Sequence, residues 1–137
     1  MSTDRVLMAH GSGGLMSQQL IDEVFKKAWN NSYLDPMMDG ALFEVSPGRM
    51  AMSTDSFVIT PVFFPGGDIG KLAICGTVND LVACGATPLY MSTAFIIEEG
   101  LLLSDLKKIA ESMAATAQKA GVKLVTGDTK VVEKGSA

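Results

Sequence analysis

The stretch GDIGKLAICGTVNDLVACGATP (residues 67–88) predicts one helix whose two ends are both marked in the sequence. Asp68 is placed to cap the first turn, because a short carboxylate there accepts a hydrogen bond from a free backbone N–H. Gly85 suits the left-handed conformation that ends many helices, and Pro88 follows shortly after it. The apolar stripe of this helix is expected at Val78, Leu81 and Val82.

Two further amphipathic helices are predicted on either side of this stretch. LMSQQLIDEVFKKAW (residues 15–29) and SDLKKIAESMAATAQKAG (residues 104–121) both carry apolar residues at helical spacing. Such a stripe packs on a core, so its members are predicted to be buried. They are Leu20, Ile21, Val24, Phe25 and Ala28 in the first helix, and Leu106, Ile109, Ala110, Met113 and Ala117 in the second.

Strands are predicted at residues 41–46, 49–60, 89–99 and 122–132, where Thr, Ile, Val and Phe predominate. Helices and strands are interspersed without a strict βαβ alternation, which predicts an α+β fold with a mixed sheet of about four strands and helices on one face. A chain of 137 residues is one domain by size. Because it stops directly after a predicted strand, we expect residues 1–137 to be one domain of a longer protein.

Composition narrows the class of protein. Hydrophobic residues make up 47% and charged residues 19%, as in a packed core, and the net charge of −4 argues against nucleic-acid binding. The N-terminus lacks the apolar core of a signal peptide. The longest apolar run, FVITPVFF (residues 57–64), is too short to cross a membrane. We therefore expect a cytoplasmic protein without a nucleic-acid or membrane partner.

The two cysteines are too few for a disulfide scaffold. Cys75 and Cys84 lie nine positions apart in one predicted helix, which sets them about 180° apart around its axis. They cannot pair or jointly hold a metal ion within that helix. We expect both to be small buried side chains.

AHGSGG (residues 9–14) is a glycine-rich segment directly before a predicted helix. It does not match a Walker loop or a dinucleotide-binding fingerprint. Gly11, Gly13 and Gly14 nevertheless let the backbone turn its N–H groups toward an anion at the start of that helix. The alternative is that these residues form a mobile N-terminal segment in which the glycines only break the chain into turns. His10 is expected to be a satisfied hydrogen-bonding group rather than a catalyst.

Three aspartates are candidate metal ligands. Asp55 lies within a strand pattern, Asp80 in mid-helix and Asp128 at the end of a strand, each among hydroxyl, amide or glycine neighbours. Taken singly, each has a structural alternative: a bond to nearby backbone, or a solvated helix position. Carboxylates that gather repel one another unless a cation joins them, and oxygen ligands suit Mg²⁺ bound with phosphates.

Five segments in chain order carry a family resemblance: AHGSGG, STDSFVITPVFFPGGDIGKLAICGTVNDL, GATPLY, FIIEEGL and VTGDTKVVEKG. Over about residues 5 to 135 they resemble the N-terminal domain of the HypE family of hydrogenase maturation proteins. That family belongs to the PurM-like ATP-binding superfamily, with aminoimidazole ribonucleotide synthetase, selenophosphate synthetase and thiamine-monophosphate kinase. Two of the longer runs are specific to the HypE type: FFPGGDIGKLAICGTVND and VTGDTKVV. The short motifs TD, ND and GDT occur across the superfamily when taken alone.

The resemblance implies an ATP-dependent carbamoyl dehydratase. Proteins of this family convert an S-carboxamide on a C-terminal cysteine into a thiocyanate, the source of the cyanide ligands of [NiFe]-hydrogenase. The carbamoyl group comes from HypF, and a HypC–HypD complex accepts the cyanide. The implied cofactors are ATP and Mg²⁺. The N-terminal domains are expected to form a homodimer by pairing their sheets into a barrel, with ATP near the subunit and domain boundaries.

The resemblance also implies roles for individual residues. The glycine segment would wrap phosphates through Gly11, Gly13 and Gly14. Mg²⁺ and the polyphosphate would be held by Asp55, Asp80 and Asp128, of which Asp80 would be catalytic. Lys130, on the same strand face as Asp128, would meet a phosphate.

The chain departs from the family because it lacks the C-terminal domain and the terminal cysteine. We therefore expect that it does not complete the reaction alone. Two alternatives stay open: another PurM-like synthetase or kinase, such as a selenophosphate synthetase, or a non-catalytic dimerisation module.

Overall fold

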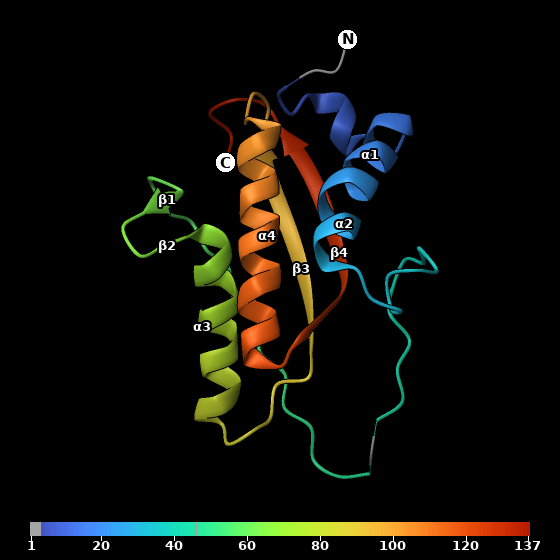
Figure 1. The fold of residues 1–137 in the computed structure, drawn as a ribbon, viewed down its shortest axis with the longest axis vertical. Coiled ribbons are helices and arrows are strands. Elements are labelled where there is room, and N and C mark those ends of the chain that lie inside the picture. Colours follow the sequence, from blue (N-terminus) through green and yellow to red (C-terminus); the bar gives the residue numbers. More distant parts are fainter. Residues whose placement is uncertain (1–3, 46) are drawn as a thin grey trace.

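A computed structural model describes residues 4–45 and 47–137 as two long helices and a composite N-terminal helix around a short parallel sheet (Figure 1). The elements in chain order are η1 (Met8–Gly11), α1 (Leu15–Leu20), η2 (Ile21–Lys26), α2 (Lys27–Trp29), β1 (Phe63–Phe64), β2 (Gly67–Asp68), α3 (Ile69–Ala83), β3 (Tyr90–Glu98), α4 (Leu103–Ala120) and β4 (Lys123–Val132). The predicted helix over residues 15–29 is confirmed as the consecutive elements α1, η2 and α2, and its middle turn is a π-helix. Among the described residues, no helix is both long and apolar enough to cross a membrane.

The ends of α3 are those that the sequence predicts. Asp68 Oδ1 accepts hydrogen bonds from the backbone N–H groups of Gly70 (2.7 Å) and Lys71 (3.1 Å). Its second oxygen accepts the Ser112 hydroxyl of α4 at 2.5 Å. Gly85 follows the last turn with φ of +75°. The capping carboxylate therefore both starts α3 and ties it to α4.

The predicted apolar stripe of α3 is only partly correct. The buried residues of this helix are Gly70 and Ile74, and Val78 packs against the core, while Val82 is 57% exposed. α3 is buried through its N-terminal half, so the side chains of its last turn are left uncovered. For the same reason Cys84 is exposed, and Cys75 is only half-buried, which corrects the expectation that both are buried.

Gly70 sits where α3 crosses α4. A Cβ atom at this position would lie 2.7 Å from both Ile109 O and Met113 Cγ. We expect Gly70→Ala to lower the free energy of unfolding by about 1–3 kcal/mol, as overpacking does, when measured by urea denaturation. Gly40→Ala is the matched control, because no heavy atom lies within 4 Å of its Cβ position. Equal losses in the two variants would contradict the expectation.

β3 and β4 form a parallel pair that α4 connects. Their register places Ala94 beside Asp128 and Phe95 beside Thr129. Along β3, Met91 and Ile97 are buried and Phe95 packs against the core, whereas Ile96 between them is 69% exposed. Alternate residues thus face the helices and the solvent, in keeping with helices on one face of the sheet. All five predicted core positions of α4 are buried.

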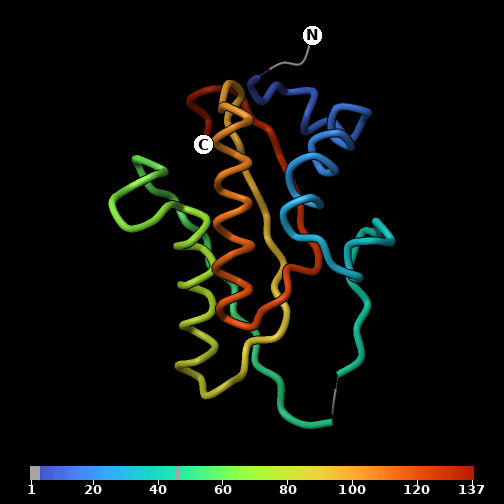
Figure 2. Tube along the Cα trace, in the orientation of Figure 1, coloured from blue at the N-terminus to red at the C-terminus, as the bar shows by residue number. Residues whose placement is uncertain are grey.

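The predicted strands over residues 41–46 and 49–60 do not form in the described residues; Ser46 lies outside them. Residues 41–45 and 47–58, here called the arm, lead away from α2 and return beside α3 (Figure 2). Arm residues Leu42, Met52 and Val58 are 78%, 93% and 93% exposed. A strand needs a neighbour for its backbone groups, and this copy of the chain offers the arm none. The α+β class is confirmed, but within the described residues the sheet has two parallel strands beside the β1–β2 hairpin rather than four mixed ones.

Candidate functional site

A pocket of about 520 Å³ lies between the N-terminal helices and β4. Its polar lining joins the glycine-rich segment to the strand sequence GDTK. Its apolar lining comes from the N-terminal helix, the loop that follows it and β3. The polar residues include His10, Gly11, Gly13, Ser17, Gly127, Asp128, Thr129 and Lys130, and the apolar ones include Phe25, Trp29, Met37, Met38 and Phe95. Two motifs from opposite ends of the chain therefore meet at one cavity.

The glycine segment is built into the fold rather than trailing from it. At Gly11 the backbone approaches β4 so closely that a Cβ atom would lie 2.7 Å from Val131 N. Gly13 has φ of +81°, and its N–H donates to Ser17 Oγ at 2.9 Å. The Gly13 amide reaches an anion only if Ser17 releases it. Gly14, the third predicted glycine, is not among the residues that line the pocket.

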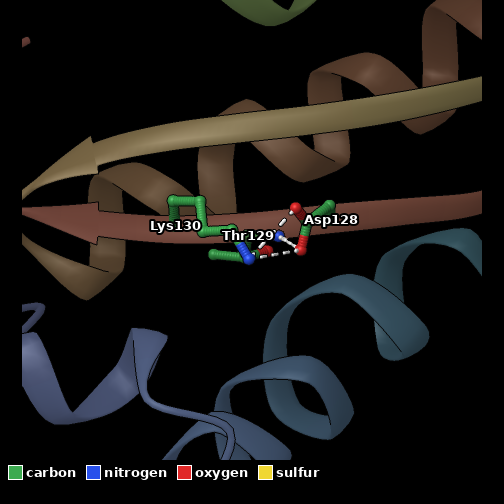
Figure 3. Close-up of polar contacts among 3 residues, drawn as sticks. All are labelled: Asp128, Thr129 and Lys130. Atoms are coloured by element: carbon green, nitrogen blue, oxygen red, sulfur yellow. Dashed lines mark hydrogen bonds and ion pairs between the residues drawn. The ribbon is translucent and has the colours of Figure 1, made fainter.

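Asp128 and Lys130 lie together on β4, as their alternate spacing predicts (Figure 3). Lys130 Nζ is 3.3 Å from Asp128 Oδ2, and Thr129 N–H donates to Asp128 Oδ1 at 2.9 Å. The two charged side chains are 64% and 63% exposed. An ion pair so exposed is worth at most about 1 kcal/mol. Either group can therefore turn to a bound ligand at little cost.

Asp55 and Asp80 lie away from this pocket, on the arm and α3. Ser53 Oγ donates to Asp80 Oδ2 at 3.2 Å. A Cβ atom on Gly76, one turn earlier in α3, would lie 2.5 Å from the Phe57 ring. Asp55 lies on the arm between these two contacts, and both carboxylates are exposed.

The three predicted carboxylates do not converge within one copy of the chain. No group of three His, Cys, Asp or Glu side chains in the described ranges is arranged to hold a metal ion. α4 separates α3 from the N-terminal helix that walls the pocket (Figure 1). Asp128 thus lies at the pocket, whereas Asp55 and Asp80 lie along α3.

Sequence reasoning missed several residues of the pocket. Thr93 of β3 lines it, and Thr93 Oγ1 is buried without a hydrogen-bond partner among the described residues. Tyr33 also lines it, and the Tyr33 hydroxyl lies 3.2 Å from that of Tyr90. That hydrogen bond raises the pKa of the Tyr90 phenol above its ordinary value. The sequence offers no local signal for these residues, because their role comes from tertiary contact alone.

The pocket residues suit a magnesium–nucleotide complex. Its volume of about 520 Å³ falls within the range of about 300–1,000 Å³ usual for small-molecule sites. Asp128 and Asp39 are the carboxylates in its lining, and Lys130 supplies a cation. Mg²⁺ in proteins is held by one or two carboxylates together with substrate phosphates. The donors therefore fit a metal carried by a nucleotide, not a cage made only of protein ligands.

Comparison with known proteins places this geometry in a family. Residues 37–137 match the family described as AIR synthase related protein, N-terminal domain. The carbamoyl dehydratase HypE of Azotobacter vinelandii is 58% identical over 130 residues, which cover 95% of this chain and 38% of that protein.

Two solved structures extend the similarity to three dimensions. The crystal structure of hydrogenase maturation protein HypE in complex with ATP superposes with a TM-score of 0.92 at 48% identity, covering 96% of this chain and 39% of that one. A HypE–HypF complex structure matches with a TM-score of 0.64 at 59% identity, covering 86% of this chain and 38% of that one. The chain thus spans about two fifths of the proteins that it resembles.

Proposed function

Because the chain belongs to the AIR synthase related family, we propose that it is the ATP-binding and dimerisation domain of a HypE-type carbamoyl dehydratase. The observation that carries this proposal is the pocket in which Gly11, Asp128 and Lys130 meet. The similarity to a HypE structure in complex with ATP supports it independently. The whole protein would dehydrate an S-carboxamide on a C-terminal cysteine to a thiocyanate, and this chain alone would not.

The pocket residues take complementary roles in this proposal. The chemistry that bound ATP supplies is activation of the carboxamide oxygen as a leaving group. Lys130 would offset negative charge on the phosphates, and Asp128 would help to hold Mg²⁺. The bare backbone at Gly11 lets the first helical turn lie close against β4, which fixes one wall of the site. The protein thus contributes charge neutralisation and positioning, as in other phosphoryl transfers.

A second copy of the chain would complete the site. The arm exposes apolar side chains such as Met52 and Val58, which suits pairing of sheets into a barrel between two protomers. Asp55 lies on that arm, and Asp80 lies beside it. We infer that they act at the subunit boundary, with Asp80 as the catalytic carboxylate. HypF as carbamoyl donor and HypC–HypD as cyanide acceptor belong to the full-length protein, and the similarity to HypE in a HypE–HypF complex supports the first of these partners.

Titration with Mg-ATP tests the proposal directly. Trp29 is the single tryptophan and lines the pocket, so its emission reports binding there. We expect Lys130→Gln to raise the Kd by about 10- to 100-fold, the range for a hydrogen bond to a charged group.

Lys108→Gln is the matched control for that titration. Lys108 also pairs with an aspartate on its own element, Asp105, and is equally exposed at 64%. We expect its Kd to equal that of the unmodified chain. An unchanged Kd in Lys130→Gln, or equal weakening in the two variants, would contradict the assigned role.

Sedimentation of Val58→Glu tests the arm as a dimer interface. Val58 is 93% exposed in the single chain, so a charge there leaves the fold intact but opposes burial against a partner. We expect the variant to be monomeric where the unmodified chain is dimeric. Ser104→Glu, at an exposed position of α4 outside the arm, measures the effect of added charge alone. Dimerisation that survives in Val58→Glu would exclude this face.

The exposed apolar arm also favours a second candidate function, a dimerisation and docking module. A chain that dimerises but does not bind Mg-ATP would favour it over the first. The run FFPGGDIGKLAICGT argues against another PurM-like synthetase, such as one that uses selenide. Measuring phosphate release with each substrate would distinguish the two enzymes. A cytoplasmic location stays a prediction.

A further inference from the structure

We propose that His10 contacts the ligand: its Nε2–H donates a hydrogen bond to a phosphate oxygen of the nucleotide in the pocket. This inference rests on the proposed nucleotide site and assigns a role to a residue that sequence reasoning set aside as structural. His10 lies in η1, is 7% exposed and lines the pocket. It is thus a buried titratable group at the edge of a cavity.

The other ring nitrogen of His10 has a fixed role. The backbone N–H of Leu7 donates to His10 Nδ1 at 2.8 Å. A nitrogen that accepts a hydrogen bond carries no proton, so the neutral ring bears its hydrogen on Nε2. The local fold therefore leaves Nε2 as the donor of this ring.

That donor has no hydrogen-bond partner within residues 4–45 and 47–137, where only Nδ1 of this ring is bonded. Nε2 is not among the fully buried atoms without a partner, where Thr93 Oγ1 stands alone in the described residues. It is therefore open to the cavity that His10 lines and can donate to a ligand there. The carboxylate that β4 contributes to the same pocket, Asp128, is already shared by Thr129 N–H and Lys130 Nζ. Lys130 and the glycine segment both favour an anion in the same pocket. A phosphate oxygen is the acceptor that suits all of these groups.

His10 therefore acts in binding and orientation rather than as a base. A ring whose Nε2 carries the hydrogen cannot take a proton at that atom. Because η1 ends at Gly11, two residues before Gly13, a bond from His10 to the phosphates would also fix the glycine segment relative to β4. Lys130 approaches from the strand, so the anion would be held from two sides.

Nitrogen NMR of the histidine ring tests this inference cleanly, because the chain contains one histidine. In ¹⁵N-histidine-labelled chain we expect the Nε2–H tautomer, and we expect the Nε2 resonance to shift on addition of Mg-ATP or inorganic triphosphate. Adenosine, which lacks phosphate, should leave it in place. Binding of Mg-ATP with an unmoved Nε2 resonance would overturn the role of His10 alone. No binding of Mg-ATP would overturn both the nucleotide site and this inference.

Two substitutions of His10 distinguish the role of Nδ1 as an acceptor from the role of Nε2 as a donor. Asn places a carbonyl oxygen near the position of Nδ1, so His10→Asn keeps the acceptor for Leu7 N–H and loses the donor. Gln extends an amide toward the position of Nε2, so His10→Gln keeps a donor and loses the acceptor. We expect His10→Asn to keep the thermal midpoint and raise the Kd for Mg-ATP by about 5- to 20-fold, with adenosine binding unchanged.

His10→Gln should show the opposite pattern, with a lower thermal midpoint but nearly normal affinity for Mg-ATP. Binding of Mg-ATP by His10→Asn as tight as that of the unmodified chain would show that the residue is structural only. Equal loss of ATP and adenosine binding would also overturn a phosphate contact. Should a variant fail to fold, the NMR experiment on the unmodified chain still decides.

Discussion

Asp80→Asn in the full-length protein is expected to lower ATP cleavage by about 10²–10³-fold or more, the scale seen when one charge-stabilising group is removed, and to leave the dimer intact. Asn keeps the size of the side chain and can still accept the Ser53 hydroxyl that contacts Asp80 at 3.2 Å. It removes only the negative charge that a divalent cation needs. Phosphate release from the carbamoylated protein measures the effect, and sedimentation checks the assembly.

Asp105→Asn supplies a control for the loss of one acidic charge. Asp105 pairs with Lys108 on α4 and is part of neither the pocket lining nor the arm, so phosphate release should be normal. Unchanged phosphate release in Asp80→Asn would refute its catalytic assignment. A loss of cleavage together with dissociation would instead assign Asp80 to the interface.

Trp29→Ala is expected to have the largest effect on stability, about 3–5 kcal/mol. The Trp29 side chain is only 9% exposed and packs against Phe25 and Phe95, with ring centroids 5.1 and 6.2 Å away. Its indole N–H donates to Ala110 O of α4 at 3.1 Å. The substitution leaves a cavity and removes this hydrogen bond to α4. Because domains of this kind are stable by only about 5–15 kcal/mol, urea denaturation should show a much lower midpoint.

Trp29→Phe separates packing from the hydrogen bond. The phenyl ring keeps most of the aromatic contact and loses the donor to Ala110 O, so the loss should stay near about 1–3 kcal/mol. Because both variants lack the indole fluorophore, ATP binding must be followed by calorimetry. A loss below about 2 kcal/mol in Trp29→Ala would contradict the assignment of this side chain to the core.

The helices could be predicted because their signals are local. Asp68 caps α3 through contacts within its own first turn, and Gly121 ends α4 with φ of +72°. The spacing that predicts Leu106 and Ile109 as core residues is a property of the helix itself. Such features do not depend on what the rest of the chain does, so the bounds of all three helices were predicted closely.

The strands were predicted less well because a strand is stabilised by another strand. The patterns at residues 41–46 and 49–60 are as β-like as those of β3 and β4, but in one copy of the chain no neighbour pairs with the described part of them. The short hairpin of β1 and β2 gave no recognisable signal, since it is two residues long on each side. Pattern alone cannot supply the partner on which pairing depends.

The sequence by itself determined the helices, the α+β class, and the two motifs, AHGSGG and GDTK, that we propose bind the nucleotide. Only the tertiary structure decided that Gly11 packs on β4, so that these motifs line one pocket, while Asp80 lies on another face of the molecule. The tertiary structure also places His10 at the edge of that pocket, with Nδ1 bonded to Leu7 N–H and Nε2 left as the donor. The physical reason is that residue type and spacing act along a few turns of chain, whereas a binding site depends on contacts between segments that only packing brings together.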